Sequence, residues 1–266
     1  MTLSITSFDL VSRQSTCLQQ VKTFPVLQRF RINSDLTSVR PLTDLFQKAR
    51  MPNLQHLQVS LSPRRINERE APHWTNLFRI LPSTASKLKC FVLDSVFPLN
   101  HAGWSNLKLL TKDLEHLSEY DLTMLWVYPP ISSALSLDNI SRYLLCWRNL
   151  ESLTLNTPSL GFEVLVVIAQ TLFKLGFLGI HIDGRQLPTA DSIPILESSL
   201  GTLIISGDLE QPLALVRLID RIFPNLRYTS FAPYQETEND MWTQAKLLLN
   251  VLREARSDER ARSSHN

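Results

Sequence analysis

Apolar residues recur along the chain with one local spacing: a large apolar residue is followed by two more, three and five positions further on. The last two are two residues apart and so share one face of a β-strand, whereas the residues beside them point to the other face. Five stretches match this spacing clearly, and they begin at Leu54, Leu88, Leu150, Leu175 and Leu200. Weaker matches begin at Leu27, Leu117 and Leu226, and a marginal one begins at Ile5. The nine starts are 22 to 34 residues apart, and most of these intervals fit the 20–29 residues typical of leucine-rich repeats.

The stretches between these predicted strands have a helical period in several places. Residues 41–49 begin with Pro41, which the first turn of a helix tolerates. Residues 160–173 are apolar on nearly all sides and predict a helix packed between neighbours. Residues 212–223 are amphipathic and stop before Pro224, which cannot continue a helix without strain. Strands and helices in alternation predict a right-handed α/β solenoid with parallel strands on its concave side.

An ordinary α/β domain with a leucine-rich parallel sheet is the alternative. Its strands would be buried on both faces and would contain continuous Val and Ile runs. Here the apolar residues alternate with Arg, Gln, Glu, Ser and Thr, which favours a sheet with one face open to solvent. We therefore predict an α/β leucine-rich repeat solenoid, or horseshoe, over residues 1–238 with helices outside. A solenoid needs its ends capped, so we expect a capping helix over 239–257 and a disordered tail over 258–266.

The composition is that of an ordinary globular protein, with 44% hydrophobic and 20% charged residues. The formal net charge of +2 does not by itself indicate a nucleic acid or an anionic membrane as the partner. No apolar run approaches the roughly 20 residues of a membrane span, and no secretory signal is recognisable. Three distant cysteines, Cys17, Cys90 and Cys146, argue against a disulfide framework. These features predict a cytoplasmic or nuclear protein.

The motifs of nucleotide binding, metal binding and hydrolysis are missing from the sequence. His181 and Asp183 share one face of a predicted strand, but two ligands are too few for a metal site, and solvated polar side chains explain them better. Cys90 follows Lys89, which would lower the pKa of a thiol, although a buried structural cysteine is the simpler interpretation. We therefore expect no enzyme activity, no cofactor and no metal.

The side chains that alternate with the inward-facing leucines define the predicted concave face. Parallel strands lie about 4.8 Å apart, so several adjacent strands offer enough surface for a protein partner. A register error of one residue would turn these side chains into the core. The predicted partner-binding residues are Arg29, Arg31, His56, Gln58, Asp94, Glu119, Asp121, Asn156, Phe177, His181 and Tyr228.

Two repeat openings and one helix carry a resemblance to a known family. Met51-Pro-Asn-Leu54 and Phe223-Pro-Asn-Leu226 open predicted strands, and Trp242 lies in the predicted C-terminal helix. With these features the chain resembles the leucine-rich repeat region of fungal, especially basidiomycete, F-box proteins over most of residues 20–256. The resemblance implies a protein–protein interaction module that holds the substrate of a ubiquitin ligase. In that family an F-box upstream of the repeats docks a Skp1-type adaptor.

The F-box itself is absent from this sequence. No Leu-Pro-x-Glu-x-Leu segment followed by an amphipathic helix precedes the repeats. We therefore expect either a fragment of such a ligase adaptor or a free-standing leucine-rich repeat scaffold with no link to a ubiquitin ligase. Both interpretations predict protein partners on the concave face, and a Skp1-type adaptor only where an F-box lies upstream.

Overall fold

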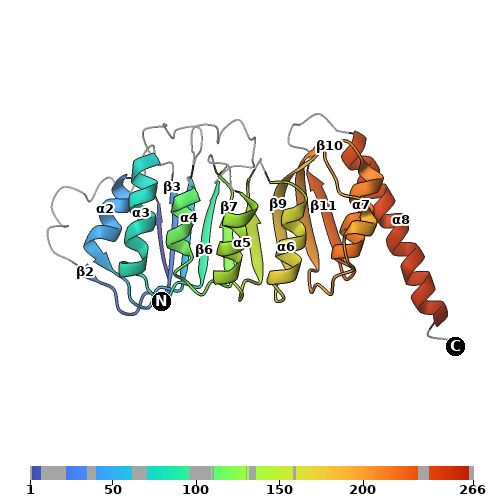
Figure 1. The fold of residues 1–266 in the computed structure, drawn as a ribbon. Coiled ribbons are helices and arrows are strands. Elements are labelled where there is room, and N and C mark those ends of the chain that lie inside the picture. The colour runs from blue at the N-terminus through green and yellow to red at the C-terminus, as the bar shows by residue number, and fades with distance from the viewer. Residues whose placement is uncertain are drawn as a thin grey trace. The chain divides into compact units, whose positions relative to one another are not determined.

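A computed structural model describes residues 2–6, 22–34, 40–61, 71–95, 109, 111–129, 131, 136–157, 160–232 and 240–263 (Figure 1). The chain divides into two compact units. Unit 1 is Met1–Thr157 and unit 2 is Pro158–Asn266. Each unit is considered by itself.

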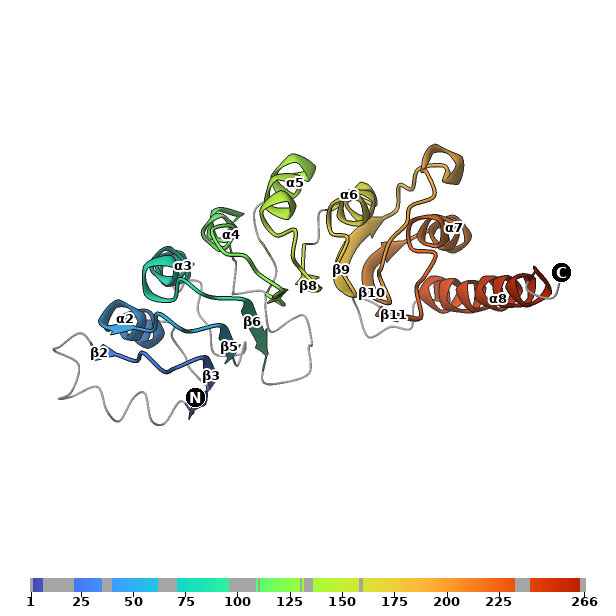
Figure 2. The same cartoon turned by 90° about the horizontal axis from the view of Figure 1, so that it is seen from below.

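Unit 1 is a parallel sheet with helices on one side. The described strands are hydrogen-bonded in chain order, and every pairing is parallel. Its strands are β1 (Thr2–Thr6), β3 (Arg29–Ser34), β5 (His56–Leu61), β6 (Cys90–Ser95), β7 (Met124–Val127) and β8 (Ser152–Leu155). Its helices are α2 (Arg40–Lys48), α3 (Ala71–Thr84), α4 (Thr111–Leu117) and α5 (Leu137–Cys146), and a short parallel pair joins β2 (Lys22–Thr23) to β4 (Ala49–Arg50). Figure 2 shows the four helices on the same side of the strands.

Unit 2 repeats this arrangement with three parallel strands. They are β9 (Phe177–Gly184), β10 (Thr202–Leu209) and β11 (Tyr228–Ala232), and β10 lies between the other two. The helices are α6 (Glu163–Thr171), α7 (Pro212–Ile222) and α8 (Asp240–Ser263), with a 3-10 turn η4 at Ala190–Ser192. The predicted α/β class with parallel strands is therefore confirmed in both units. None of the helices described is both long and apolar enough to cross a membrane.

One backbone hydrogen-bond pattern recurs from strand to strand. In unit 1 the carbonyl of Gln55 accepts the backbone N–H groups of both Lys89 and Cys90, at 2.8 and 2.9 Å. In unit 2 the carbonyl of Gly201 accepts those of Arg227 and Tyr228 at 2.8 and 2.9 Å. In each case the acceptor directly follows the first apolar residue of the repeat. The same double acceptance is made by Gln28, Lys89, Thr123 and Gly176.

The apolar positions of the repeats form the core, as their period predicts. Leu54, Leu57 and Val59 have no exposed surface, and the corresponding residues of β3, β6, β7, β8, β9 and β10 are also buried. The side chains between them point to the face opposite the helices. Sequence spacing therefore places the core of each strand correctly wherever the repeat start is identified correctly.

The repeat start at Leu117 is wrong. Leu117 is the last residue of α4, and the strand that follows is β7. The correct start is Leu122, because Thr123 and Met124 donate their N–H groups to the carbonyl of Lys89. Leu122, Leu125 and Val127 are fully buried, and they match the spacing as well as the clear repeats do. The apolar last turn of α4 matches the spacing of a repeat start, five residues before the correct start at Leu122.

The first strand also differs from its predicted position. Residues 5–10 were the expected match, but β1 spans Thr2–Thr6. Its register pairs Leu3 with Phe30 and Ile5 with Ile32, so Ile5 occupies the third apolar position of the pattern, not the first. The remainder of the expected match, residues 7–10, lies outside the described residues.

Helix α8 covers β11, the last described strand of unit 2, and packs on α7. Trp242, Ala245 and Leu249 are buried, and the indole Nε1 of Trp242 donates to the backbone carbonyl of Gly207 at 2.9 Å. The helix extends to Ser263, beyond the predicted start of a disordered tail at residue 258. The Arg, Glu and Ala residues after position 252 are strong helix formers, which accounts for the extension.

The backbone of β10 makes a close contact that only glycine permits. Gly207 has a φ of +128°, and a Cβ atom there would lie 1.8 Å from the carbonyl oxygen of Ile182 on β9. At Gly201 a Cβ atom would meet its nearest neighbour, the carbonyl oxygen of Gly176, at 3.7 Å. Gly201, which directly precedes β10, is therefore a matched control.

Replacement of Gly207 by Ala is expected to lower the free energy of unfolding of the protein by about 3 kcal/mol or more, because strained backbone and a steric clash combine. Gly201→Ala is expected to change it by less than about 1 kcal/mol. Urea denaturation followed by circular dichroism measures both. Equal effects of the two substitutions would contradict the proposed strand contact.

Candidate functional site

The face of the unit 1 sheet opposite the helices is the candidate site. The strand register arranges its side chains in rows that cross the strands. The first row runs from β3 to β8 through Arg29, His56, Cys90, Met124 and Ser152, and the second through Arg31, Gln58, Val92, Trp126 and Thr154. A third row contains Ser60 and Asp94, and Tyr128 and Asn156 follow the last paired residues of β7 and β8.

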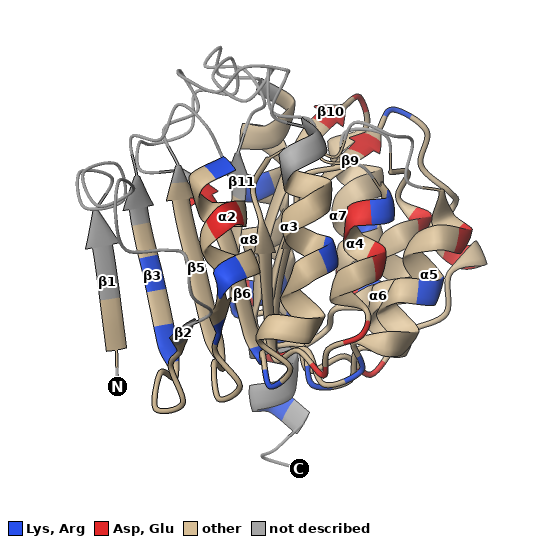
Figure 3. Ribbon diagram, turned by 90° about the vertical axis from the view of Figure 1, so that its left-hand side faces the viewer, with Lys and Arg blue, Asp and Glu red and all other residues tan. Residues whose placement is uncertain are grey.

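The β3 strand of this face is basic. Arg29 and Arg31 are exposed on β3, which carries the two blue positions in Figure 3. His56 lies beside Arg29 in the next strand and is half-buried. Burial lowers the pKa of His56, and the charges of Arg29 and Arg31 lower it further. The imidazole is therefore uncharged at neutral pH, and the positive charge at β3 comes from the two arginines.

Asp94 is the predicted acidic residue that the structure places on this face. Its Oδ2 accepts a hydrogen bond from Nε2 of Gln58 on the adjacent strand at 3.0 Å. The same Gln58 amide lies 3.4 Å from the hydroxyl of Ser60. Asp94 is only partly exposed, and Gln58 on β5, the strand between β3 and β6, holds its carboxylate in position.

Glu119 and Asp121 do not belong to the face, which corrects their prediction. Glu119 lies in the turn after α4, where its carboxylate is 4.0 Å from Nδ1 of His116. Asp121 precedes the strand and forms an ion pair with Lys89 of the previous repeat, and its Oδ1 accepts from Asn149 of the next at 2.7 Å. Both errors follow from the misplaced repeat start at Leu117. Asp121 therefore links consecutive turns and does not face a partner on the open surface.

The residues that the incorrect start concealed are aromatic. Trp126 and Tyr128 make an edge-to-face contact with ring centroids 6.4 Å apart and an interplanar angle of 87°. The indole Nε1 of Trp126 donates to the hydroxyl of Ser152 at 2.7 Å, which fixes the ring on the sheet. Burial and the nearby charge of Asp94 raise the pKa of Tyr128. The start at Leu122, with Leu125 and Val127, was the sequence signal that would have found both rings.

Asn156, another predicted site residue, lies at the end of β8 beside this aromatic pair. Its Nδ2 donates to the backbone carbonyl of Tyr128 at 2.9 Å. Its Oδ1, together with Oδ1 of Asp94 and the hydroxyl of Thr154, is buried and has no hydrogen-bond partner within the described parts of the chain. This end of the face therefore has unused hydrogen-bonding capacity around two fixed rings.

Unit 2 carries the other three predicted site residues on its own sheet. Phe177 on β9 pairs in register with Thr202 on β10, which pairs with Tyr228 on β11. Tyr228 is 56% exposed, and Phe177 is half-buried. His181 is buried, and its Nδ1 lies 3.2 Å from the hydroxyl of Ser206. The strand register thus brings the two aromatic residues into one row.

A metal site at His181 and Asp183 and an activated Cys90 thiol receive no support from the geometry of the described residues. No group of three or more potential metal ligands occurs among the residues that the structure describes. Asp183 is bound by the guanidinium of Arg185 at 2.6 Å, and this hydrogen bond lowers the pKa of its carboxyl. Burial raises the pKa of the Cys90 thiol to about 11, so Lys89 does not activate it.

Comparison with known proteins leaves the family open. No protein-family model matches the chain, and no curated protein matches it. The function must therefore be argued from the surface itself.

The thiol of Cys90 is expected to react slowly in the folded protein. A pKa of about 11, compared with the ordinary 9.0, lowers the thiolate fraction near pH 8 about a hundredfold, and burial also restricts access. In a Cys17→Ser variant, iodoacetamide at pH 8 should modify the exposed Cys146 first, as mass spectrometry would show. Both thiols should react in denaturant. Equal rates in the folded protein would mean that Cys90 is accessible and ionised.

The hydroxyl of Thr154 is expected to add nothing to stability. Thr154→Val replaces a buried hydroxyl, which has no partner among the residues that the structure describes, by a methyl group, so the free energy of unfolding should stay constant or rise by about 1 kcal/mol. Thr84→Val is the control, because the buried Thr84 hydroxyl donates to the carbonyl of Phe46 at 3.1 Å, and its loss should cost about 1 kcal/mol. Urea denaturation compares them. Equal losses would show that Thr154 has a bonded hydroxyl.

Proposed function

We propose that this chain is a protein–protein interaction module, a leucine-rich repeat solenoid whose open sheet face contacts the partner. Three features support a solenoid of repeats: parallel strands in chain order, helices on one side of them in unit 1, and the double acceptance that recurs at the starts of β5 to β8, β10 and β11. A two-sided α/β sheet buries both faces of its strands. In unit 1 the second face instead carries exposed arginines on β3 and half-buried aromatic rings at β7, although Val92 on β6 and Thr154 on β8 are buried there.

The observation that carries the proposal is the aromatic pair. Trp126 and Tyr128 are partly exposed, held in an edge-to-face contact and fixed by the hydrogen bond to Ser152. Tryptophan, tyrosine and arginine dominate the binding energy of protein interfaces, and a ring that is already fixed loses little side-chain entropy on binding. The pair lies on the same face as Arg29 and Arg31. Such a surface suits a protein partner with an apolar group and acidic residues beside it.

The family resemblance extends the proposal to one biological setting. We propose that the module recognises the substrate of an F-box-type ubiquitin ligase; the alternative is a free-standing repeat scaffold. A Skp1-type adaptor and a cullin should co-purify with the tagged protein in the first case. Their absence, with other partners retained, would favour the scaffold.

Charge reversal on β3 is expected to abolish partner capture. In Arg29→Glu combined with Arg31→Glu, proteins that co-purify with the tagged chain should fall about tenfold or more, because like charges now face the partner. Trp126→Ala should give a comparable loss. Quantitative mass spectrometry of the purified complexes measures both.

A charge-matched control lies on the helical side. Arg79 on α3 and Arg142 on α5 are exposed, and reversal of both should leave the partner list unchanged. Thermal melting verifies that each variant folds. Loss of the same partners in both double variants, or in neither, would count against the open face as the binding surface.

A further inference from the structure

A pocket of about 410 Å³ lies in unit 2 between α7, α8 and the turn that precedes β11. This volume falls within the range of small-molecule sites. Its apolar wall is formed by four buried side chains, Ile219, Phe223, Leu226 and Leu249. The face of the unit 1 sheet takes no part in it, so the pocket is a separate site.

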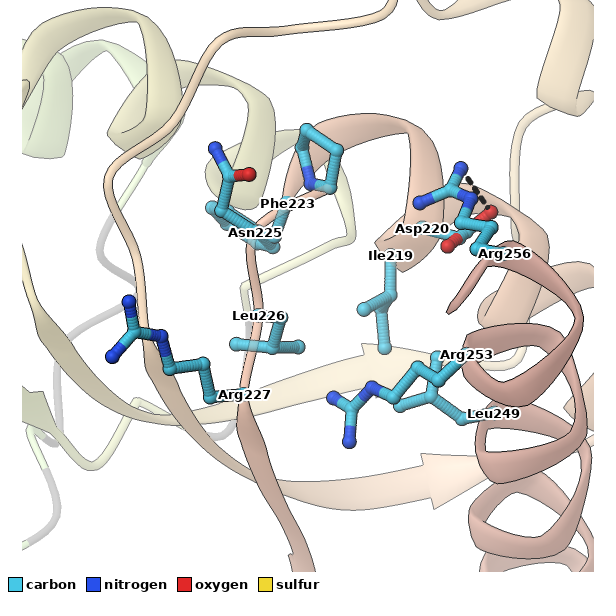
Figure 4. A pocket seen from close by; sticks show the side chains of 10 residues that line it. Ile219, Asp220, Phe223, Asn225, Leu226, Arg227, Leu249, Arg253 and Arg256 are labelled. Atoms are coloured by element: carbon cyan, nitrogen blue, oxygen red, sulfur yellow. Dashed lines mark ion pairs between the residues drawn. The ribbon is translucent and has the colours of Figure 1, made fainter. Parts of the chain in front are cut away.

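Three arginines surround this apolar wall. Figure 4 shows Arg227 on the turn and Arg253 and Arg256 on α8, around Leu226 and Ile219. Asp220 on α7 is the one carboxylate in the lining. The formal charge of the lining is therefore +2, from three guanidinium groups and one carboxylate.

The partners of the arginines differ. Arg256 is paired with Asp220, with 2.7 Å between its nitrogen and the carboxylate oxygen. Arg253 donates to the uncharged hydroxyl of Thr229 and has its guanidinium directed from α8 toward the turn (Figure 4). Arg227 is exposed and makes no ion pair with any residue that the structure describes. Asp220 thus neutralises one of the three positive charges.

Partial burial of these charged groups strengthens their attraction for an anion. It lowers the pKa of Arg253, although the charge of Asp220 acts in the opposite direction. It also raises the pKa of Asp220, although Arg256 and Arg253 oppose the shift. Charges that are partly removed from water interact more strongly with an incoming ion than surface charges do. An anion would therefore gain more here than at an exposed arginine.

We propose that this pocket binds a small carboxylic acid with an apolar body. Its carboxylate accepts hydrogen bonds from Arg253, because a guanidinium presents two parallel N–H groups that match the two oxygens. Its hydrocarbon body lies on the apolar wall, which a fully hydrated anion such as inorganic phosphate would leave without a contact. Arg227 and Arg256 add positive potential around the bound carboxylate.

Octanoate is a suitable probe, and its binding to the whole 266-residue chain is measured by isothermal titration calorimetry and by the shift in melting temperature. Octanoate should bind and raise the melting temperature, and octylammonium and inorganic phosphate should not. Affinity should fall as the salt concentration rises. Phosphate binding without octanoate binding would overturn the apolar part of the proposal, and equal binding of octanoate and octylammonium would overturn the role of the arginines.

Variants of the lining make the assignment specific. Arg253→Gln should weaken octanoate binding about tenfold, and Arg227→Gln about two- to threefold. Arg217→Gln is the matched control. It removes the same charge, but Arg217 is exposed on α7 and does not line the pocket. It should leave the dissociation constant unchanged. A control effect as large as that of Arg253→Gln would overturn the site.

Asp220→Asn is expected to strengthen octanoate binding, an effect that loss of folding cannot produce. The substitution removes the competing carboxylate and releases Arg256, so octanoate should bind about three- to tenfold more tightly. Melting curves without ligand establish how far the variant is folded. Weaker or unchanged binding in a folded Asp220→Asn variant would overturn the proposal.

Discussion

The double hydrogen bond at the start of β5 to β8, β10 and β11 is the constraint on which the rest of the structure depends. The carbonyl that follows the first apolar residue of one repeat accepts two N–H groups of the next, as Lys89 does from Thr123 and Met124. This contact fixes where each strand begins. Because side chains alternate strictly along a strand, a fixed start also decides which of them enter the core and which face outward.

Asparagines beside the strand starts reinforce this contact from repeat to repeat. The Nδ2 of Asn53 donates to the carbonyl of Pro25 at 2.7 Å, and that of Asn225 to the carbonyl of Ser198 at 3.2 Å. The Pro-Asn-Leu openings thus have a structural explanation: proline ends the preceding segment, asparagine binds the neighbouring turn and leucine enters the core. Fold and register are secured at the strand starts, which leaves the open-face side chains available for contacts with a partner.

The sequence predicted most strands and the α/β class because the apolar period is strong where repeats are regular. It failed at Leu117 because α4 ends in an apolar turn, and leucine spacing alone does not distinguish that turn from Leu122. The hydrogen bond to Lys89 makes that distinction, and a pairing between repeats is invisible in a single sequence. Because of the misplaced start, the predicted site did not include Trp126 and Tyr128. Arg29, Gln58 and Asp94 lie in repeats whose starts were identified correctly, and the prediction included them.

The way in which α8 covers β11 accounts for the charge of the pocket in unit 2. An uncovered strand edge would leave backbone groups and apolar side chains exposed, and α8 supplies Trp242 and Leu249 as cover. Further along the helix, Arg253 and Arg256 continue the contact, since their long stems pack on apolar surface while their guanidinium groups reach polar partners. Because the apolar stems supply this packing, the arginines do not each need a carboxylate partner. A helix that covers a strand with arginines therefore accumulates positive charge beside an apolar wall, which is the combination that an organic anion requires.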